Sequence, residues 1–277
     1  MKILTLGLAA IVICASDAAA KTVSENRAWT DVYPVAGAAP RLEVSNIWGG
    51  VRVRVGEPGV ITVSVTESRS APDQQRFEYS LEVLALDVKA DAAGVALKVG
   101  HRDDSWWQRK DCHDCRVDYQ FDITVPPDAV IDVGTVMDGK VDVLGVTGAI
   151  SASNVNGPIV IDGVSECVDV GNVNGPITMG FTRAPRQDCR IETVNGDVTL
   201  DMPENTSLDV SLDLFNGRVS SELPVGQFEL PASVETIVED GRTRYRIQQL
   251  AGIRIGAGGP VYSVASINGD LLIRKHQ

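Results

Sequence analysis

The chain has 277 residues, with 25 lysines and arginines against 37 aspartates and glutamates, which gives a formal net charge of −12. An acidic chain lacks the basic surface with which proteins bind nucleic acids, so we exclude that class of partner. Valine, isoleucine, threonine and glycine are abundant and stretches with helical periodicity are scarce, which predicts an all-β protein.

Residues 1–20 have the three parts of a secretory signal peptide. Lys2 supplies the positive charge, residues 3–15 are mostly apolar, and the small residues 18–20 form the expected cleavage site. A lipoprotein signal would use Cys14, but the residue before it is bulky where a small one is required. The apolar run is also short for a membrane anchor. We therefore expect an exported protein, in the periplasm or on the cell surface, with no transmembrane segment after cleavage.

An N-terminal β region is expected over residues 21–130. Alternating apolar and polar residues predict short strands bounded by turns, at residues 42–45, 51–55, 60–66, 95–99 and 117–125. The stretch Asp73 to Leu84 is the single helix candidate, with Ser70 or Asp73 as its N-cap. A strand from Tyr79 to Leu86 is the alternative.

The hairpin loop 101–116 gathers unusual side chains and supports three interpretations. An exposed aromatic platform would use Trp106 and Trp107 to bind a sugar ring or a partner protein. A zinc site is the second interpretation, but two of its ligands would be adjacent in sequence and the compartment is oxidising; its ligands would be His101, Cys112, His113 and Cys115. We favour the third, in which a Cys112–Cys115 disulfide closes the loop and the tryptophans pack on the sheet. We expect no metal and no cofactor.

Residues 131–277 form a repeat block. The six residues Asn-Val-Asn-Gly-Pro-Ile begin at Asn154 and again at Asn172, which is a shift of 18 positions. Weaker copies of this unit also occur. All the copies share a turn glycine, at Gly139, Gly157, Gly175, Gly196, Gly217 and Gly269. An outlying copy runs from Ile47 to Val53. Fixed periods in this range are typical of stacked repeats.

Asn-Gly turns between short strands allow two folds. In a meander, each turn closes a two-residue hairpin. In an elongated β-solenoid, or β-helix-like stack, each unit is one coil and equal positions lie on one another. We favour the solenoid because near-identical units suit positions that stack on their own copies. Cys167 and Cys189 would then lie on adjacent coils, within reach of a disulfide.

These features together resemble the putative-adhesin family of bacterial exported β-strand-repeat proteins. The shared features are the signal peptide, the early Gly49-Gly50 strand, the strand from Phe121 to Pro126, the Asn-Gly copies, and the segments 256–260 and 267–271. The resemblance covers most of the mature chain and implies a stacked β fold outside the cytoplasm. It implies no catalytic residue, because the function of that family is unknown.

Two rows of polar residues accompany the repeats. The turn asparagines are Asn156, Asn174, Asn195, Asn216 and Asn268. They would either form a ladder with a functional face or serve only as turn residues, and we favour the second interpretation. The aspartates would bind calcium or basic partners, or line a solvated strand face, which we favour; they are Asp132, Asp142, Asp162, Asp169, Asp197, Asp201, Asp209 and Asp213.

The sequence contains no nucleophile elbow, zinc-protease, phosphate-loop or dinucleotide motif. We therefore expect a non-enzymatic, adhesin-like binding or structural module of the bacterial cell envelope, whose partner is an envelope glycan or protein. The alternative is a carbohydrate-active enzyme on the same scaffold. A cleft with convergent carboxylates and basic residues would favour the enzyme, and a smooth face of serine, threonine, asparagine and valine would favour the binding module.

Overall fold

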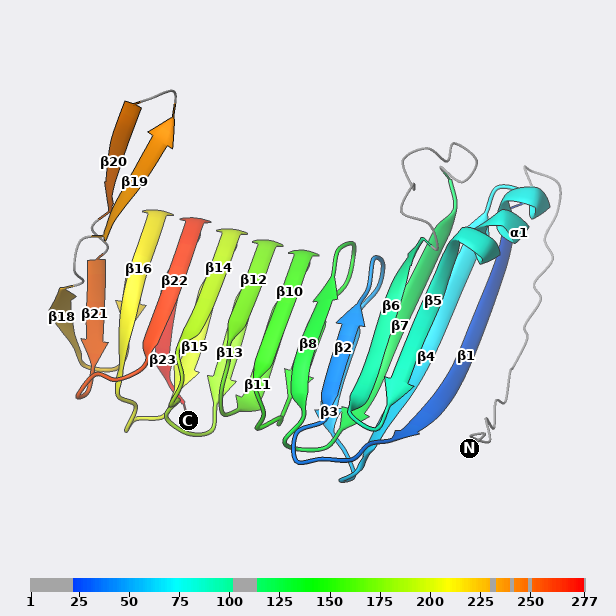
Figure 1. Cartoon of the computed structure of the whole chain (residues 1–277), viewed down its shortest axis with the longest axis horizontal. Helices are drawn as coiled ribbons and strands as arrows, with labels where there is room; N and C mark the ends of the chain where they lie inside the picture. Colours follow the sequence, from blue (N-terminus) through cyan, green and yellow to red (C-terminus); the bar gives the residue numbers. More distant parts are fainter. Residues whose placement is uncertain (1–21, 102–113, 230–232, 240–241, 249–250, 277) are drawn as a thin grey trace.

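A computed structural model describes residues 22–101, 114–229, 233–239, 242–248 and 251–276. The chain is elongated and built almost entirely from strands, with one helix among these residues, α1 (Gln74–Val83) (Figure 1). The predicted all-β class is confirmed. No helix in the described part of the chain is both long and apolar enough to cross a membrane.

Two large sheets and a separate hairpin contain the strands. Sheet B has eleven described strands, in the spatial order β18 (Val225–Glu229), β21 (Ala251–Ile255), β16 (Leu208–Asn216), β22 (Val261–Asn268), β14 (Cys189–Asn195), β12 (Asp169–Asn174), β10 (Ile150–Asn156), β8 (Val130–Thr135), β2 (Arg41–Ser45), β6 (Gly94–His101) and β5 (Leu84–Asp91). Sheet A has ten, in the order β1 (Val23–Pro34), β4 (Val60–Ala71), β7 (Arg116–Val125), β3 (Val51–Val55), β9 (Val141–Leu144), β11 (Ile159–Val164), β13 (Ile177–Phe181), β15 (Val198–Met202), β23 (Leu271–Lys275) and β17 (Val219–Ser221). The hairpin of β19 (Ser233–Glu239) and β20 (Arg242–Gln248) projects from the β18 end (Figure 1).

Each repeat unit consists of one strand of sheet B followed by one strand of sheet A. The strands before and after an Asn-Gly turn therefore belong to different sheets, and the hairpin interpretation of these turns is wrong. Equal positions of neighbouring units pair in parallel, for example Asn154 with Asn172 and Ile159 with Ile177. Alternate residues such as Ile150 and Ile161 are fully buried between the sheets, and each contributes about 2 kcal/mol through removal of apolar surface from water.

The units do not stack in the order of the sequence. The upstream copy lies next to the first repeat, because β2 and β3 pair in parallel with β8 and β9. The last unit, β22 and β23, lies between the unit of β14 and β15 and the unit of β16 and β17. The final segment of the chain is thus inserted into the stack as an interior layer.

The repeated glycines are required because neighbouring units approach closely at the turn. A Cβ atom on Gly175 would overlap the carbonyl oxygen of Gly157, and one on Gly157 would overlap that of Gly139. The same relation continues along the stack, through Gly139 on Gly49, Gly196 on Gly175, Gly269 on Gly196 and Gly217 on Gly269. A positive φ, which glycine adopts more readily than other residues, is present only at Gly157 (142°) and Gly175 (145°) among the six repeated glycines.

The predicted helix is confirmed with Asp73 as its N-cap, since its side chain accepts a hydrogen bond from the backbone N–H of Arg76 at 2.8 Å. The alternative, a strand from Tyr79 to Leu86, is wrong for residues 79–83, which are helical, and the next strand begins at Leu84. Helix α1 covers one end of the molecule, beside β4 (Figure 1).

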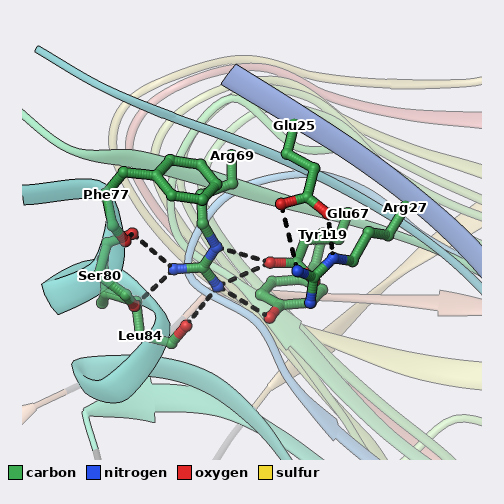
Figure 2. A network of polar contacts seen from close by, with 8 residues as sticks. All are labelled: Glu25, Arg27, Glu67, Arg69, Phe77, Ser80, Leu84 and Tyr119. Atoms are coloured by element: carbon green, nitrogen blue, oxygen red, sulfur yellow. Dashed lines mark hydrogen bonds and ion pairs between the residues drawn. The ribbon is translucent and has the colours of Figure 1, made fainter. Parts of the chain in front are cut away.

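A buried arginine fixes this helix to sheet A (Figure 2). Arg69 is 4% exposed and donates to the carboxylate of Glu67 at 2.7 Å. It also donates to the hydroxyl of Ser80 at 3.0 Å and to the backbone carbonyl of Leu84 at 2.7 Å. One guanidinium group thereby satisfies the end of the helix and neutralises a buried carboxylate at the same time.

Candidate functional site

Most of the loop 101–116, which contains the candidate binding residues, lies outside the described residues. Trp106, Trp107, Cys112 and His113 are in that part of the chain, and their three interpretations stay predictions. His101 is the last residue of β6. Cys115, just before β7, takes part in a disulfide.

The second pair of cysteines is joined as the stacked arrangement requires. Cys167 and Cys189 form a disulfide with 5.5 Å between their Cα atoms. Cys189 is the first residue of β14 and Cys167 lies two residues before β12, the neighbouring strand. The disulfide therefore links adjacent units, and both cysteines are buried.

A groove of 640 Å³ lies on the outer face of sheet B. It runs across strands β2, β8, β10, β12, β14, β22 and β16, which lie side by side in Figure 1. Its floor has one residue from each strand, all paired in register: Ser45, Gly134, Ser153, Gly171, Glu192, Ala265 and Asp213. The first four are small, so the backbone lies open along about 14 Å of the stack, at roughly 4.8 Å per strand.

One wall of the groove is a row of apolar side chains, which we call the apolar ladder: Val136, Val155, Val173, Val194, Ile267 and Phe215. Phe215 is 81% exposed, Ile267 49%, Val136 38% and Val173 37%. Five of these six residues come directly before a turn asparagine, one on each of five adjacent strands. A continuous outward row of large apolar side chains is unusual on a soluble surface and marks interaction sites.

Outside the groove lining, two residues before the floor on each strand, lies a row of exposed positions that is rich in carboxylates and that we call the acidic row. Its residues are Glu43, Asp132, Ser151, Asp169, Arg190 and Ser263, which are in register. Arg41 bridges Glu43 at 4.0 Å and Asp132 at 3.0 Å. Arg190 donates to Glu192 at 2.5 Å, and this hydrogen bond raises the pKa of the Arg190 guanidinium, with a smaller contribution from the charge of Asp169. Two arginines therefore serve four carboxylates.

The turn asparagines form a hydrogen-bonded ladder at the edge of the groove. Asn174 donates to Asn156 at 3.0 Å, and Asn195 donates to Asn174 at 2.9 Å. The ladder continues through the inserted unit, where Asn268 donates to Asn195 at 2.9 Å and Asn216 donates to Asn268 at 3.0 Å. These residues are more than turn formers, because each links its unit to the next through its side-chain amide.

A second row of polar side chains lies inside the stack beneath the groove. Asn154 donates its amide to the carbonyl of Gly139 at 2.8 Å, and Asn172 donates to that of Gly157 at 2.9 Å. Both side chains are at least 96% buried. They hold the turns of consecutive units together from below and so fix the course of the apolar ladder above them.

The expected acidic stripe does not form one solvated face. Asp142 is 6% exposed, and its Oδ1 atom lies 2.7 Å from Nζ of Lys140. Asp209 is 5% exposed and accepts two hydrogen bonds from Arg254. The interpretation as solvated residues is wrong for these two. Among the described residues, no three histidine, cysteine, aspartate or glutamate side chains are grouped to hold a metal ion.

The groove itself was not evident as a site in the sequence. Strand alternation places Val155 and Val173 on the outer face, and their recurrence before each turn asparagine is the signal that points to them. The floor and the acidic row carry no such signal, because their residues differ from unit to unit.

No family model and no curated protein matches this chain. Among solved structures, the chain is similar to a putative cell adhesion protein from Clostridium sporogenes, with 9% sequence identity and a TM-score of 0.44. The alignment covers 90% of this chain and 99% of that one.

Proposed function

We propose that this chain is an exported, non-enzymatic, adhesin-like binding or structural module of the bacterial cell envelope, and that it binds its partner along the groove of sheet B. The observation that carries the proposal is the apolar ladder, whose side chains are exposed or half-buried over six adjacent strands, beside a floor that is serine and glycine on four strands. Such a surface presents the same chemistry at each step and suits an elongated partner better than a small molecule.

The scaffold proposed for this surface is a β-solenoid over residues 131–277, preceded by an N-terminal β region of degenerate coils over residues 21–130. In-register parallel pairing of successive units and the stacked turn glycines support it. Export through the signal peptide at residues 1–20 is supported by the disulfides of Cys115 and of Cys167 with Cys189, because such bonds persist in oxidising compartments.

The alternative, a carbohydrate-active enzyme, would use Glu192 and Asp213 at one end of the groove. They lie on β14 and β16 with Ala265 of β22 between them, so their backbones are about 10 Å apart. An inverting pair needs its carboxyl groups about 6.5–9.5 Å apart, which side chains on two strands at this spacing can reach. Glu192 is already bound to Arg190, and this ion pair favours a structural role for its carboxylate.

The test is binding of the mature protein to a panel of envelope glycans, peptidoglycan and envelope proteins. A groove variant, Val155→Lys with Val173→Lys, places charge on the apolar ladder. Its matched control is Val160→Lys with Thr178→Lys, which adds the same charge at outward positions on sheet A of the same two units. We expect binding that the groove variant loses and the control retains.

Two further results would move the function elsewhere. Binding that survives the groove variant but is lost in Trp106→Ala with Trp107→Ala would place the site in the 101–116 loop. Release of product from any glycan, abolished by Glu192→Gln, would replace the binding module with the enzyme.

A further inference from the structure

We propose that the groove of sheet B receives a basic, amphipathic α-helix of a partner protein, laid across the strands along the stack. This inference rests on the proposed function, since it names the class of partner for the same groove. The spacing of the apolar ladder and the acidic row, the apolar ladder itself and the distribution of charge beside the groove each favour such a helix.

The strip of sheet between the apolar ladder and the acidic row is wide enough for a helix. The two rows are four residues apart on each strand, as Val155 and Ser151 are on β10, which is about 13 Å at roughly 3.3 Å per residue. A helix with its side chains is about 10–12 Å in diameter. The small floor residues Gly134, Ser153 and Gly171 leave room for it to approach the backbone of the sheet.

The apolar ladder provides the contact that anchors one face of the helix. Its steps of about 4.8 Å are close to the helical pitch of about 5.4 Å, so successive turns of a helix meet successive strands. A partner with apolar residues at positions i, i+3, i+4 and i+7 would bury Val155, Val173 and their neighbours continuously. Four strands of small floor correspond to about three helical turns.

The charge beside the groove selects the polar face of the partner. Glu43, Asp132 and Asp169 of the acidic row and Glu192 of the floor share Arg41 and Arg190. Two lysines lie in register at one end, Lys98 with Ser45 and Lys89 with Glu43 through Ala96. The chain as a whole carries −12. Lysines or arginines flanking the apolar stripe of the helix would meet these carboxylates, whereas a neutral glycan would offer them no opposite charge.

The experiment uses the mature chain and a fluorescein-labelled peptide of 14 leucines and lysines, with the leucines at helical spacing. Fluorescence anisotropy would give Kd for this peptide, for a scrambled peptide of the same composition, and for a version with a central proline that cannot form the helix. We expect the helical peptide to bind at least tenfold more tightly than either of the other two.

Protein variants locate the binding. Val155→Lys with Val173→Lys, and separately Asp132→Lys with Asp169→Lys, should each weaken the helical peptide at least tenfold. The control Val160→Lys with Thr178→Lys has the same added charge as the first variant, and it should leave Kd within twofold. Circular dichroism and thermal unfolding of every variant would show that the fold is retained.

The outcomes are distinguishable. Equal binding of helical, scrambled and proline peptides, or binding that the groove variants do not alter, would overturn the inference, because the acidic chain would then attract any cationic peptide. Loss of envelope-glycan binding in the groove variant, with no peptide bound, would overturn the helix and keep the proposed function. No binding of either kind to the groove would overturn both.

Discussion

Asn174 and Asn156 are joined by their side-chain amides at 3.0 Å, although they are 18 residues apart and belong to separate strands. This hydrogen bond joins the side chains of two residues whose backbones are also paired, so side chains and backbones have the same register. A ladder of this kind specifies register, because a shift of one residue would remove every amide from its partner. The stack is therefore held in alignment at the edge of the groove, where its apolar ladder needs to be continuous.

The two rows of asparagines should differ in their importance for stability. Asn174 is exposed, so water replaces its lost partners and Asn174→Ala should cost about 1 kcal/mol of unfolding free energy. Asn172 is buried and donates to the carbonyls of Gly157 and Gly175, both at 2.9 Å. Asn172→Ala should cost about 2 kcal/mol, because it removes a buried side chain and leaves two part-buried carbonyls without that donor. Urea unfolding of both variants measures the difference, and a larger cost at Asn174 would contradict this account.

Gly171 on β12 and Gly175 in the following turn test whether the turn glycines are needed because neighbouring units approach closely. Gly175 has φ 145° and lies against the carbonyl of Gly157, so Gly175→Ala should destabilise the chain by at least about 2 kcal/mol. A Cβ on Gly171 would meet no atom within 4 Å, and Gly171→Ala should leave stability within about 0.5 kcal/mol of the parent. Thermal unfolding compares the two. Equal effects would show that stacking of the turn glycines is unimportant.

Much of the pairing between repeat units can be predicted from the sequence. Asn154 and Asn172 head identical segments, and identical segments that need the same neighbours pair in parallel, as the structure confirms. The outlying copy at Gly49 was recognisable for the same reason and lies next to Gly139. Local turn chemistry and strand alternation are properties of short segments, so they can be predicted from sequence alone.

The order of the units and the groove were not predictable in this way. The unit containing Gly269 lies between those of Gly196 and Gly217, because parallel pairing requires matching edges and no adjacency in sequence. The groove floor combines Ser153 with Gly134 and Gly171 from other units, and its depth exists only once their register is fixed. Both features depend on long-range pairing.

The buried ion pair under helix α1 should be sensitive to removal of one partner. Arg69→Met leaves Glu67 buried without its cation and the carbonyl of Leu84 without its donor (Figure 2), so we expect a loss of about 3–5 kcal/mol. The double variant with Glu67→Gln removes the unpaired charge and should recover part of the loss. Arg274→Met, at a partly exposed pair with Asp201, is the matched control and should cost less, about 1 kcal/mol. Guanidinium unfolding tests all three.

The pair of Asp209 and Arg254 should make stability depend on acid pH. Hydrogen bonds from Arg254, at 2.7 and 2.9 Å, hold the pKa of the Asp209 carboxyl below its usual range. A group with a lowered folded pKa stabilises the protein above its unfolded pKa of about 4, and this contribution is lost as pH falls through the folded value. The stability difference between the parent and Arg254→Gln should therefore be present at pH 7 and shrink below about pH 4. A difference that grows on acidification would refute the assignment.

The Cys167–Cys189 disulfide should stabilise the middle of the stack by restricting the unfolded chain. The two cysteines are 22 residues apart in sequence, and closing a loop of that size contributes about 3 kcal/mol in the chain-entropy model. Cys167→Ala with Cys189→Ala should lower the unfolding free energy by about that amount while keeping the far-ultraviolet circular dichroism of the parent. The double variant is preferable to chemical reduction, because reduction would also open the disulfide of Cys115. Unchanged urea unfolding would show that parallel pairing alone holds β12 beside β14.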